Sequence, residues 1–194
     1  MQIILIFILP VFLIYFNVIP SSLRILVLAV SSLLIYGIIR HENWTYEDMG
    51  IRHDNFRQAL PFYIFFTVIG LAALFFIEHR LNLVNIHTKM FYVKTFIFFL
   101  PSCFFQEFVF RSFLIPKLKL IFDNNKYYVI FVNALIFSLM HIIYFNLGVV
   151  IPLVFLAGVL LAWLYIKYPN LILIAVAHSI LNLTAVLLGF FIIS

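Results

Sequence analysis

Residues 95–115 read TFIFFLPSCFFQEFVFRSFLI, an apolar run that contains one glutamate and one arginine. A helix that spans the hydrocarbon core of a bilayer needs about 20 mainly apolar residues. A charged side chain near the middle of such a helix costs about 2.5–3.5 kcal/mol on insertion scales, so it normally faces the interior of a helix bundle. This stretch therefore predicts a membrane-spanning helix with one polar face.

The rest of the chain has the same apolar character. Of its 194 residues, 66% are hydrophobic and only 10% are charged, whereas soluble domains have about 25% charged residues. We therefore expect an all-α fold, a polytopic membrane helix bundle in which residues 1–194 form a single membrane domain in the lipid bilayer. About seven transmembrane helices are predicted, at Gln2–Ile19, Leu23–Ile39, Ala59–Ile77, Thr95–Ile115, Tyr127–Asn146, Gly148–Ile166 and Asn170–Ile193.

The positions of the basic residues predict how the bundle is oriented. The first run lacks the basic start and the A-x-A site of a cleaved signal peptide, so we expect it to remain as a helix. If every run crosses, one side of the membrane holds Arg40, Arg52, Arg57, Lys117, Lys119, Lys126 and Lys167. The other side holds Arg24, Arg80, Lys89 and Lys94. The richer side is expected to be cytoplasmic, which places the N-terminus in the cytoplasm.

The net charge of +5 does not indicate a nucleic-acid partner. The twelve Lys and Arg residues are scattered between apolar runs instead of forming a basic patch, so we expect no nucleic-acid binding. The single cysteine, Cys103, excludes an intrachain disulfide and is interpreted as a packing residue.

Few polar side chains fall inside the apolar runs, and their spacing places them on shared helix faces. The embedded ionisable residues are Glu107, Arg111, His141 and His178, and the embedded amides are Asn133 and Asn182. Glu107 and Arg111 are four residues apart and can pair on one helix face, as can His178 and Asn182. Residues from three helices could thus converge on one polar pocket. Pro101 could kink the first of these helices near that pocket.

This set of side chains can support hydrolysis of an amide bond inside a membrane. A carboxylate in an apolar setting can take a proton from water, which makes Glu107 a candidate base. His141 and His178 can handle protons or orient the water, and the Asn182 amide can stabilise an oxyanion. Arg111 would hold Glu107 in place. The expected substrate is a peptide or a membrane-protein segment.

Other interpretations of the same residues stay open. The Glu107–Arg111 pair could be purely structural, and Asn133 or Asn182 could form only helix–helix hydrogen bonds. Glu107, His141 and His178 match a zinc site by type, although the usual HExxH helix is absent, so zinc is possible and no cofactor is certain. A proton or cation carrier would need polar sites along a path or paired repeats, and neither is visible.

Three motifs resemble the signature of a known family. Gln106–Arg111 (QEFVFR), Phe137–His141 (FSLMH) and His178–Asn182 (HSILN) are similar to the motifs EExxxR, FxxxH and HxxxN of the CPBP family, the CAAX proteases and bacteriocin-processing proteins also called Abi. The resemblance covers roughly residues 95–194. It implies an intramembrane endopeptidase, here one of the bacterial cytoplasmic membrane. Some family members trim prenylated CAAX proteins, and bacterial relatives are linked to bacteriocin maturation or immunity.

The chain departs from the family pattern at one central position. Gln106 stands where the family has its first glutamate, and a glutamine cannot act as a general base. Either the adjacent Glu107 takes over that role, or the chain is a catalytically degenerate member that acts as a bacteriocin immunity or membrane scaffold protein. Ser112 also occupies the position after the arginine where relatives often have glycine.

Overall fold

The computed structural model describes residues 3–81, 93–144 and 146–191, and within these ranges the chain forms helices joined by loops and turns, with no strands. The elements are η1 (Ile4–Ile8), α1 (Leu9–Tyr15), η2 (Ser21–Leu23), α2 (Arg24–His41), α3 (Phe56–Leu81), α4 (Val93–Glu107), η4 (Phe108–Leu114), α5 (Ile115–Ile121), α6 (Lys126–Leu139), α7 (Leu147–Lys167) and α8 (Leu171–Leu187). Elements that follow without a break join into seven continuous helical segments. The predicted all-α membrane helix bundle is confirmed.

Helix lengths differ from the predicted spans. By length and apolar composition, Ser21–His41, Phe56–Leu81 and Leu147–Lys167 can each cross a membrane. The helix from α4 through η4 to α5 is also continuous, and it passes through Pro101 without a break. The predicted span Tyr127–Asn146 is helical only as far as Leu139, because the chain then turns, with the His141 N–H donating to the Ser138 carbonyl. At 1.5 Å per residue, the 14-residue helix α6 is only about 21 Å long.

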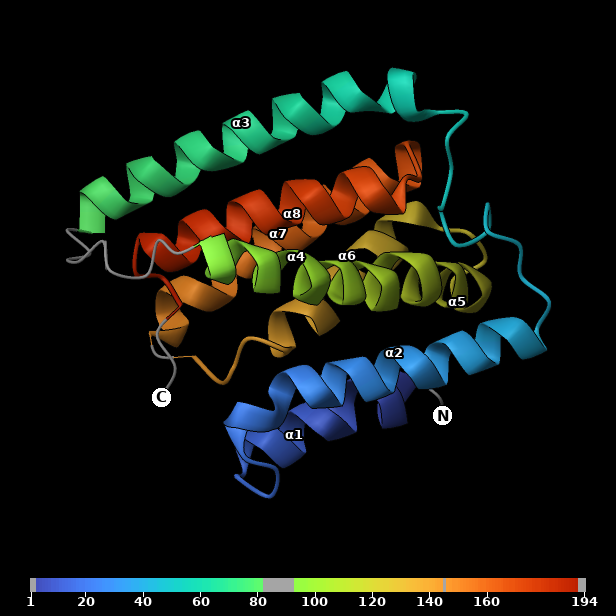
Figure 1. Cartoon of the computed structure of the whole chain (residues 1–194), viewed down its shortest axis with the longest axis horizontal. Helices are drawn as coiled ribbons and strands as arrows, with labels where there is room; N and C mark the ends of the chain where they lie inside the picture. Colours follow the sequence, from blue (N-terminus) through green and yellow to red (C-terminus); the bar gives the residue numbers. More distant parts are fainter. Residues whose placement is uncertain (1–2, 82–92, 145, 192–194) are drawn as a thin grey trace.

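The helices pack in layers that place α8 near the centre. Figure 1 shows α3 on one side, α8 and α7 next to it, α4 and α6 in the middle, and α2 with α1 on the opposite side. Helix α8 packs against both α3 and α4, and α6 packs against α7. At Gly158 of α7 an added Cβ would lie 3.2 Å from the Cα of Ala134, so this glycine permits the close approach of α6 and α7.

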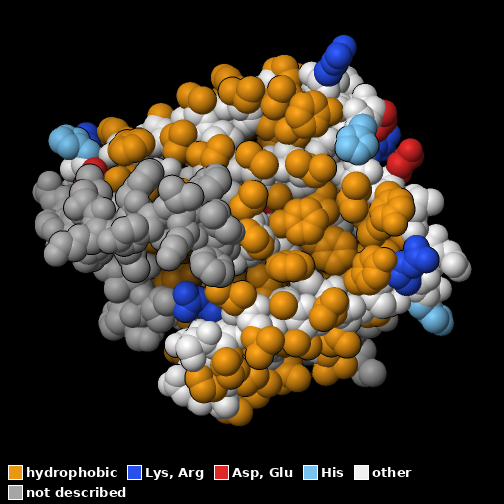
Figure 2. Space-filling model, viewed as in Figure 1, with side chains coloured by type: hydrophobic (Ala, Val, Ile, Leu, Met, Phe, Trp, Pro, Cys, Tyr) orange, Lys and Arg blue, Asp and Glu red, His pale blue; other side chains and the backbone are white. Residues whose placement is uncertain are grey.

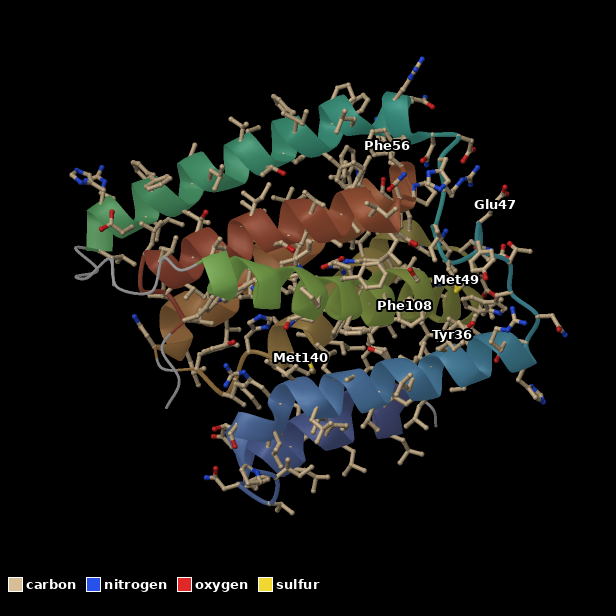
Figure 3. All side chains as sticks on the ribbon, in the orientation of Figure 1. Tyr36, Glu47, Met49, Phe56, Phe108 and Met140 are labelled. Atoms are coloured by element: carbon tan, nitrogen blue, oxygen red, sulfur yellow. The ribbon has the colours of Figure 1, made fainter. Side chains whose placement is uncertain are left out.

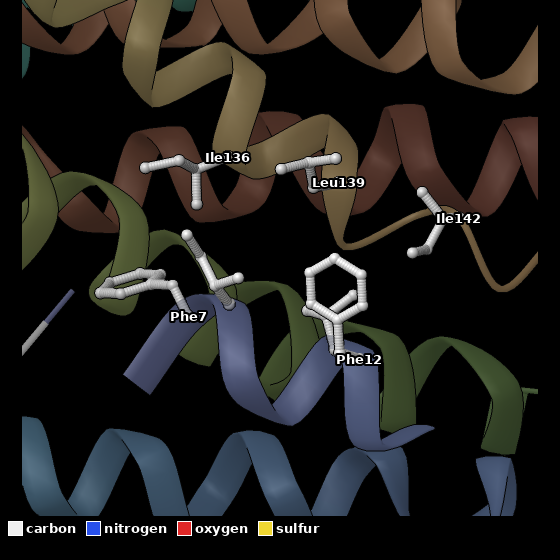
Figure 4. Close-up of a pocket in the computed structure, with 7 residues that line it drawn as sticks. Phe7, Phe12, Ile136, Leu139 and Ile142 are labelled. Carbon is white, nitrogen blue, oxygen red and sulfur yellow. The ribbon is translucent and has the colours of Figure 1, made fainter. Parts of the chain in front are cut away.

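The outer surface of the bundle is largely apolar. Large side chains such as Leu33, Leu26 and Phe65 expose more than half of their surface, at 70%, 59% and 58%. Figure 2 shows hydrophobic side chains across the visible described face, with charged ones gathered toward its ends. Such a surface matches the hydrocarbon of a bilayer. A small apolar hollow of about 10 Å³ lies between the N-terminal helical segment and α6 (Figure 4). It is lined by Phe7, Ile8, Val11, Phe12, Ile136, Leu139 and Ile142.

The polar loop between α2 and α3 forms hydrogen bonds with the α7–α8 connection at one end of the bundle. Asn55 Nδ2 donates to the Pro169 carbonyl at 2.8 Å, and Asn170 Nδ2 donates to the Arg52 carbonyl at 3.0 Å. Within the loop, Thr45 donates two hydrogen bonds to the Asp48 carboxylate, which lowers the pKa of Asp48. Figure 1 shows that α2, α5 and α7 end at this end of the bundle, where α3, α6 and α8 begin.

This arrangement gathers seven of the basic residues at one end, in the segments predicted to share a side. At that end Lys117 pairs with Glu42, with Nζ 2.6 Å from Oε1. Arg24 and Arg80 belong to the other end, at the start of α2 and near the end of α3. Lys89 lies outside the described residues, and so does the side chain of Lys94. Which end faces the cytoplasm stays a prediction.

Gly50 is required where this loop meets α7. Its φ is +74°, and an added Cβ would lie 2.2 Å from the hydroxyl oxygen of Tyr165. That hydroxyl is buried and donates to the Met49 carbonyl at 3.1 Å, so Tyr165 cannot move aside without losing a hydrogen bond.

Gly50→Ala is therefore expected to destabilise the protein by about 2–4 kcal/mol, from left-handed backbone strain and overpacking together. The matched control is Gly37→Ala in α2, where no atom lies within 4 Å of the added Cβ. This change should stabilise by about 0.5–1 kcal/mol, since alanine favours a helix more than glycine does. Unfolding in mixed micelles measures both, and equal effects would contradict the prediction.

Candidate active site

Glu107 ends α4, and each of its carboxylate oxygens contacts a different basic side chain. The residue has no exposed surface. Its Oε2 accepts a hydrogen bond from Arg111 Nε at 2.8 Å, one helical turn further along. Its Oε1 lies 2.7 Å from Nδ1 of His178, which α8 supplies because it packs directly against α4. Of the residues predicted to converge, Glu107, His141, His178 and Asn182, the structure brings Glu107 and His178 into direct contact, and Arg111 pairs with Glu107 as its spacing predicts.

Arg111 is also fully buried, and its guanidinium contacts two side chains besides Glu107. It lies in η4, a π-helix of seven buried residues. Its Nη1 donates to Oδ1 of Asn133 on α6, and its guanidinium carbon lies 5.0 Å from the centroid of the Phe137 ring. Because a guanidinium stays charged in proteins, Glu107 acts as its buried counter-ion.

His141 lies close to this cluster but is not on a helix. The sequence places it one turn after Phe137 on the fifth predicted span, whereas α6 ends at Leu139 and Met140 caps it. His141 therefore lies in the turn that follows α6. Its Nδ1 lies 3.0 Å from the Phe137 carbonyl oxygen. The Phe137 ring contacts both imidazoles, with centroid distances of 5.2 Å to His141 and 5.6 Å to His178.

Gln106 directly precedes Glu107, whereas Asn182 belongs to the motif on α8, and the two amides are differently placed. Asn182 Nδ2 donates to the Cys103 sulfur at 3.5 Å, one helical turn before Glu107. Oε1 of Gln106 is buried and has no hydrogen-bond partner within the described part of the chain. Both amides therefore have hydrogen-bonding capacity that a bound molecule or water could use.

The possible zinc ligands do not form a metal site as they are placed. Among the residues that the structure describes, no three His, Cys, Asp or Glu side chains are arranged to hold a metal ion. Glu107 contacts His178 directly, and Nδ1 of His141 lies against a backbone carbonyl. The residues that match zinc by type therefore do not fit it in this arrangement.

Two members of the cluster were not assigned a site role from the sequence. Asn133 was expected to form a helix–helix hydrogen bond, and it does so with the site arginine itself. Phe137 was noted only as the first residue of the motif that ends at His141, yet its ring contacts Arg111 and both histidines. The four-residue interval between Asn133 and Phe137 was the available signal, since it places both side chains on one face of α6.

An apolar groove of about 240 Å³ lies on a different face of the helix that holds Glu107. It is lined by Ser32, Leu33, Tyr36, Tyr46, Met49, Ile51, Phe104, Phe105 and Phe108. Figure 3 labels Tyr36, Met49 and Phe108, which mark it between α2 and α4. Because Phe108 directly follows Glu107, its side chain points about 100° away from the carboxylate.

Fold and cluster together define a membrane-embedded helix bundle with a buried carboxylate–imidazole site. Comparison with known families agrees, because a model of the type II CAAX prenyl endopeptidase Rce1-like family matches residues 88–184. The chain belongs to this Rce1-like family, which is a family of proteases within the CAAX and CPBP proteases expected from the motifs. No curated protein and no solved structure matches the chain significantly.

Proposed function

We propose that the protein is an intramembrane endopeptidase that hydrolyses a peptide bond of a peptide or membrane-protein substrate. The observation that supports this most is the contact between His178 Nδ1 and Glu107 Oε1 at 2.7 Å. A carboxylate at Nδ1 orients an imidazole, favours the tautomer with its proton on Nδ1, and stabilises the cation that forms when Nε2 accepts a proton. Glu107 would thus activate water through His178.

The reaction follows from this pairing. Nε2 of His178 takes a proton from water as the water oxygen attacks the scissile carbonyl carbon, which gives a tetrahedral oxyanion. The Asn182 amide, whose present partner is only a thiol, donates to that oxyanion. The carbon–nitrogen bond then breaks, and the proton on His178 passes to the leaving amine. His141 orients the water, and Arg111 holds Glu107.

A location for the protein is proposed on separate grounds. We place the protein in a bacterial cytoplasmic membrane, with its N-terminus in the cytoplasm and its surface in contact with lipid. The apolar described surface and the basic end of the bundle support this placement.

A second function is supported by Gln106 and competes with the first. A degenerate family member could act as a bacteriocin immunity or membrane scaffold protein. Gln106 occupies the position of the family's first glutamate, and both oxygens of Glu107 already contact basic side chains. In this case the cluster would only stabilise the bundle.

One assay in liposomes separates these two functions. Purified protein is incubated with fluorogenic peptides, one ending in a farnesylated CAAX sequence and one unmodified, because the family is described by CAAX prenyl substrates. We expect wild-type protein to cleave and Glu107→Gln to lose at least about 100-fold in rate. Glu78→Gln, a carboxylate at the end of α3, is the matched control and should cleave as wild type does.

The variant Gln106→Glu tests the degenerate alternative in the same assay. A silent wild type together with a Gln106→Glu variant that cleaves would replace the endopeptidase proposal with the degenerate one. Wild-type cleavage that persists unchanged in Glu107→Gln would instead exclude the proposed role of the Glu107–His178 pair.

A further inference from the structure

The π-helix η4 has a backbone carbonyl whose partner is a side chain of another helix. Phe110, in the middle of η4, accepts a hydrogen bond at its carbonyl from Asn133 Nδ2 at 2.8 Å. A π-helix shifts the backbone hydrogen bonds to i→i+5, and such segments frequently occur at functional sites. The donor comes from α6 and reaches across 23 positions of sequence.

The other end of the same amide binds the site arginine. Asn133 has no exposed surface, and its Oδ1 accepts a hydrogen bond from Arg111 Nη1. These two contacts allow one amide orientation only. A flipped Asn133 would turn its NH₂ toward the guanidinium, which has only donors, and its oxygen toward a carbonyl, which only accepts.

A continuous chain of contacts therefore connects the backbone of η4 to the imidazole. It runs from the Phe110 carbonyl through Asn133 to Arg111, then to Glu107 and His178. Removing Asn133 leaves the guanidinium with Glu107 and the Phe137 ring as its remaining described side-chain contacts. The guanidinium can then rotate, and Glu107 moves with it.

We propose that Asn133 is a positioning residue that fixes Arg111, and through it the Glu107 carboxylate that orients His178. It does not touch the substrate. Its role in the reaction rests on the endopeptidase function proposed above, whereas its hold on Glu107 does not. The role in the reaction is therefore tested by kinetics, and the hold on Glu107 is tested separately by unfolding.

The first measurement is the kinetics of Asn133→Leu, which has a similar shape and no amide. We expect kcat to fall about 10- to 100-fold with KM nearly unchanged, because small displacements of catalytic groups cost rate and Asn133 makes no substrate contact. The matched control is Ser138→Ala, which removes another buried polar group of α6, one whose hydroxyl bonds within the described residues to the Leu135 carbonyl of its own helix. It should retain kcat.

The second measurement needs no activity. Asn133 and Glu107 both bond to Arg111, and within the described residues no hydrogen bond or ion pair joins the two directly, so the unfolding midpoints of Asn133→Leu, Glu107→Gln and the double variant form a cycle. We expect the double variant to lose less than the sum of the two single losses, since separate sites add and coupled ones do not. Additive losses would overturn the proposal, whatever the protein cleaves.

Asn133→Asp is the second variant if Asn133→Leu does not fold. It keeps the shape and the acceptor but loses the donor to Phe110, and it adds a carboxylate that competes with Glu107 for Arg111. We expect kcat again to fall at unchanged KM, and an unfolding cycle with Glu107→Gln to be non-additive. Wild-type kcat in either folded variant would overturn the positioning role, whereas a wild type that cleaves nothing would overturn the endopeptidase function alone.

Discussion

Replacing Arg111 with leucine is expected to destabilise the protein by about 3–5 kcal/mol, the usual cost of leaving a buried charge without its partner. Arg111 and Glu107 are both fully buried, and the guanidinium also donates to Asn133. In Arg111→Leu the carboxylate retains only His178, and the Asn133 oxygen loses its donor. Reversible unfolding in mixed micelles, followed by tryptophan fluorescence, measures the change.

Two further variants show whether the loss comes from the broken buried pair. Arg52→Leu breaks an ion pair with Asp54 in which the side chains are 29% and 58% exposed, so it should cost no more than about 1 kcal/mol. The double variant Glu107→Leu with Arg111→Leu removes both charges, and we expect it to be more stable than Arg111→Leu alone. A double variant that is less stable than the single one would disprove this account.

Replacing His178 with alanine is expected to lower kcat by about 10²–10⁴-fold, the usual contribution of a general base, with little change in KM. His178 is the imidazole that contacts Glu107, and in the proposed reaction its Nε2 accepts the proton of the attacking water. The variant removes the base but leaves the Glu107–Arg111 pair in place, so the fold should persist.

The matched control is His79→Ala, an exposed histidine in the last turn of α3. It should cleave the fluorogenic peptide at the wild-type rate. Circular dichroism of both variants establishes that the helices are intact. A folded His178→Ala variant that cleaves as fast as His79→Ala would assign the proton transfer to another group.

The part of the candidate site that lies on one helix can be predicted from the sequence, because residues four apart share a helix face. Glu107 and Arg111 pair as their four-residue interval predicts, and His178 meets them. This second contact was predictable because so few ionisable groups lie within the apolar runs. Such groups avoid lipid, so they converge in the bundle interior.

The parts that the sequence does not predict depend on contacts between distant segments. The end of α6 at Leu139 has no glycine or proline signal, and the apolar run continues past it. The π-helix around Arg111 likewise has no distinct composition. Asn133 could be expected to form a bond between helices, but its two partners depend on how α6 lies against η4.

The short length of α6 has a consequence for how water would reach the proposed site. Helix α6 starts at Lys126 and covers about 21 Å, less than the hydrocarbon thickness of about 30 Å. If the first residue of α6 lies at one membrane surface, a helix of this length ends inside the hydrocarbon, and the turn with His141 would lie below the far surface. Non-helical backbone at that depth must be buried in protein or line a hydrated cavity. Hydrolysis consumes one water per bond, and a locally thinned bilayer above this turn would give water a shorter path from the far side to the imidazoles.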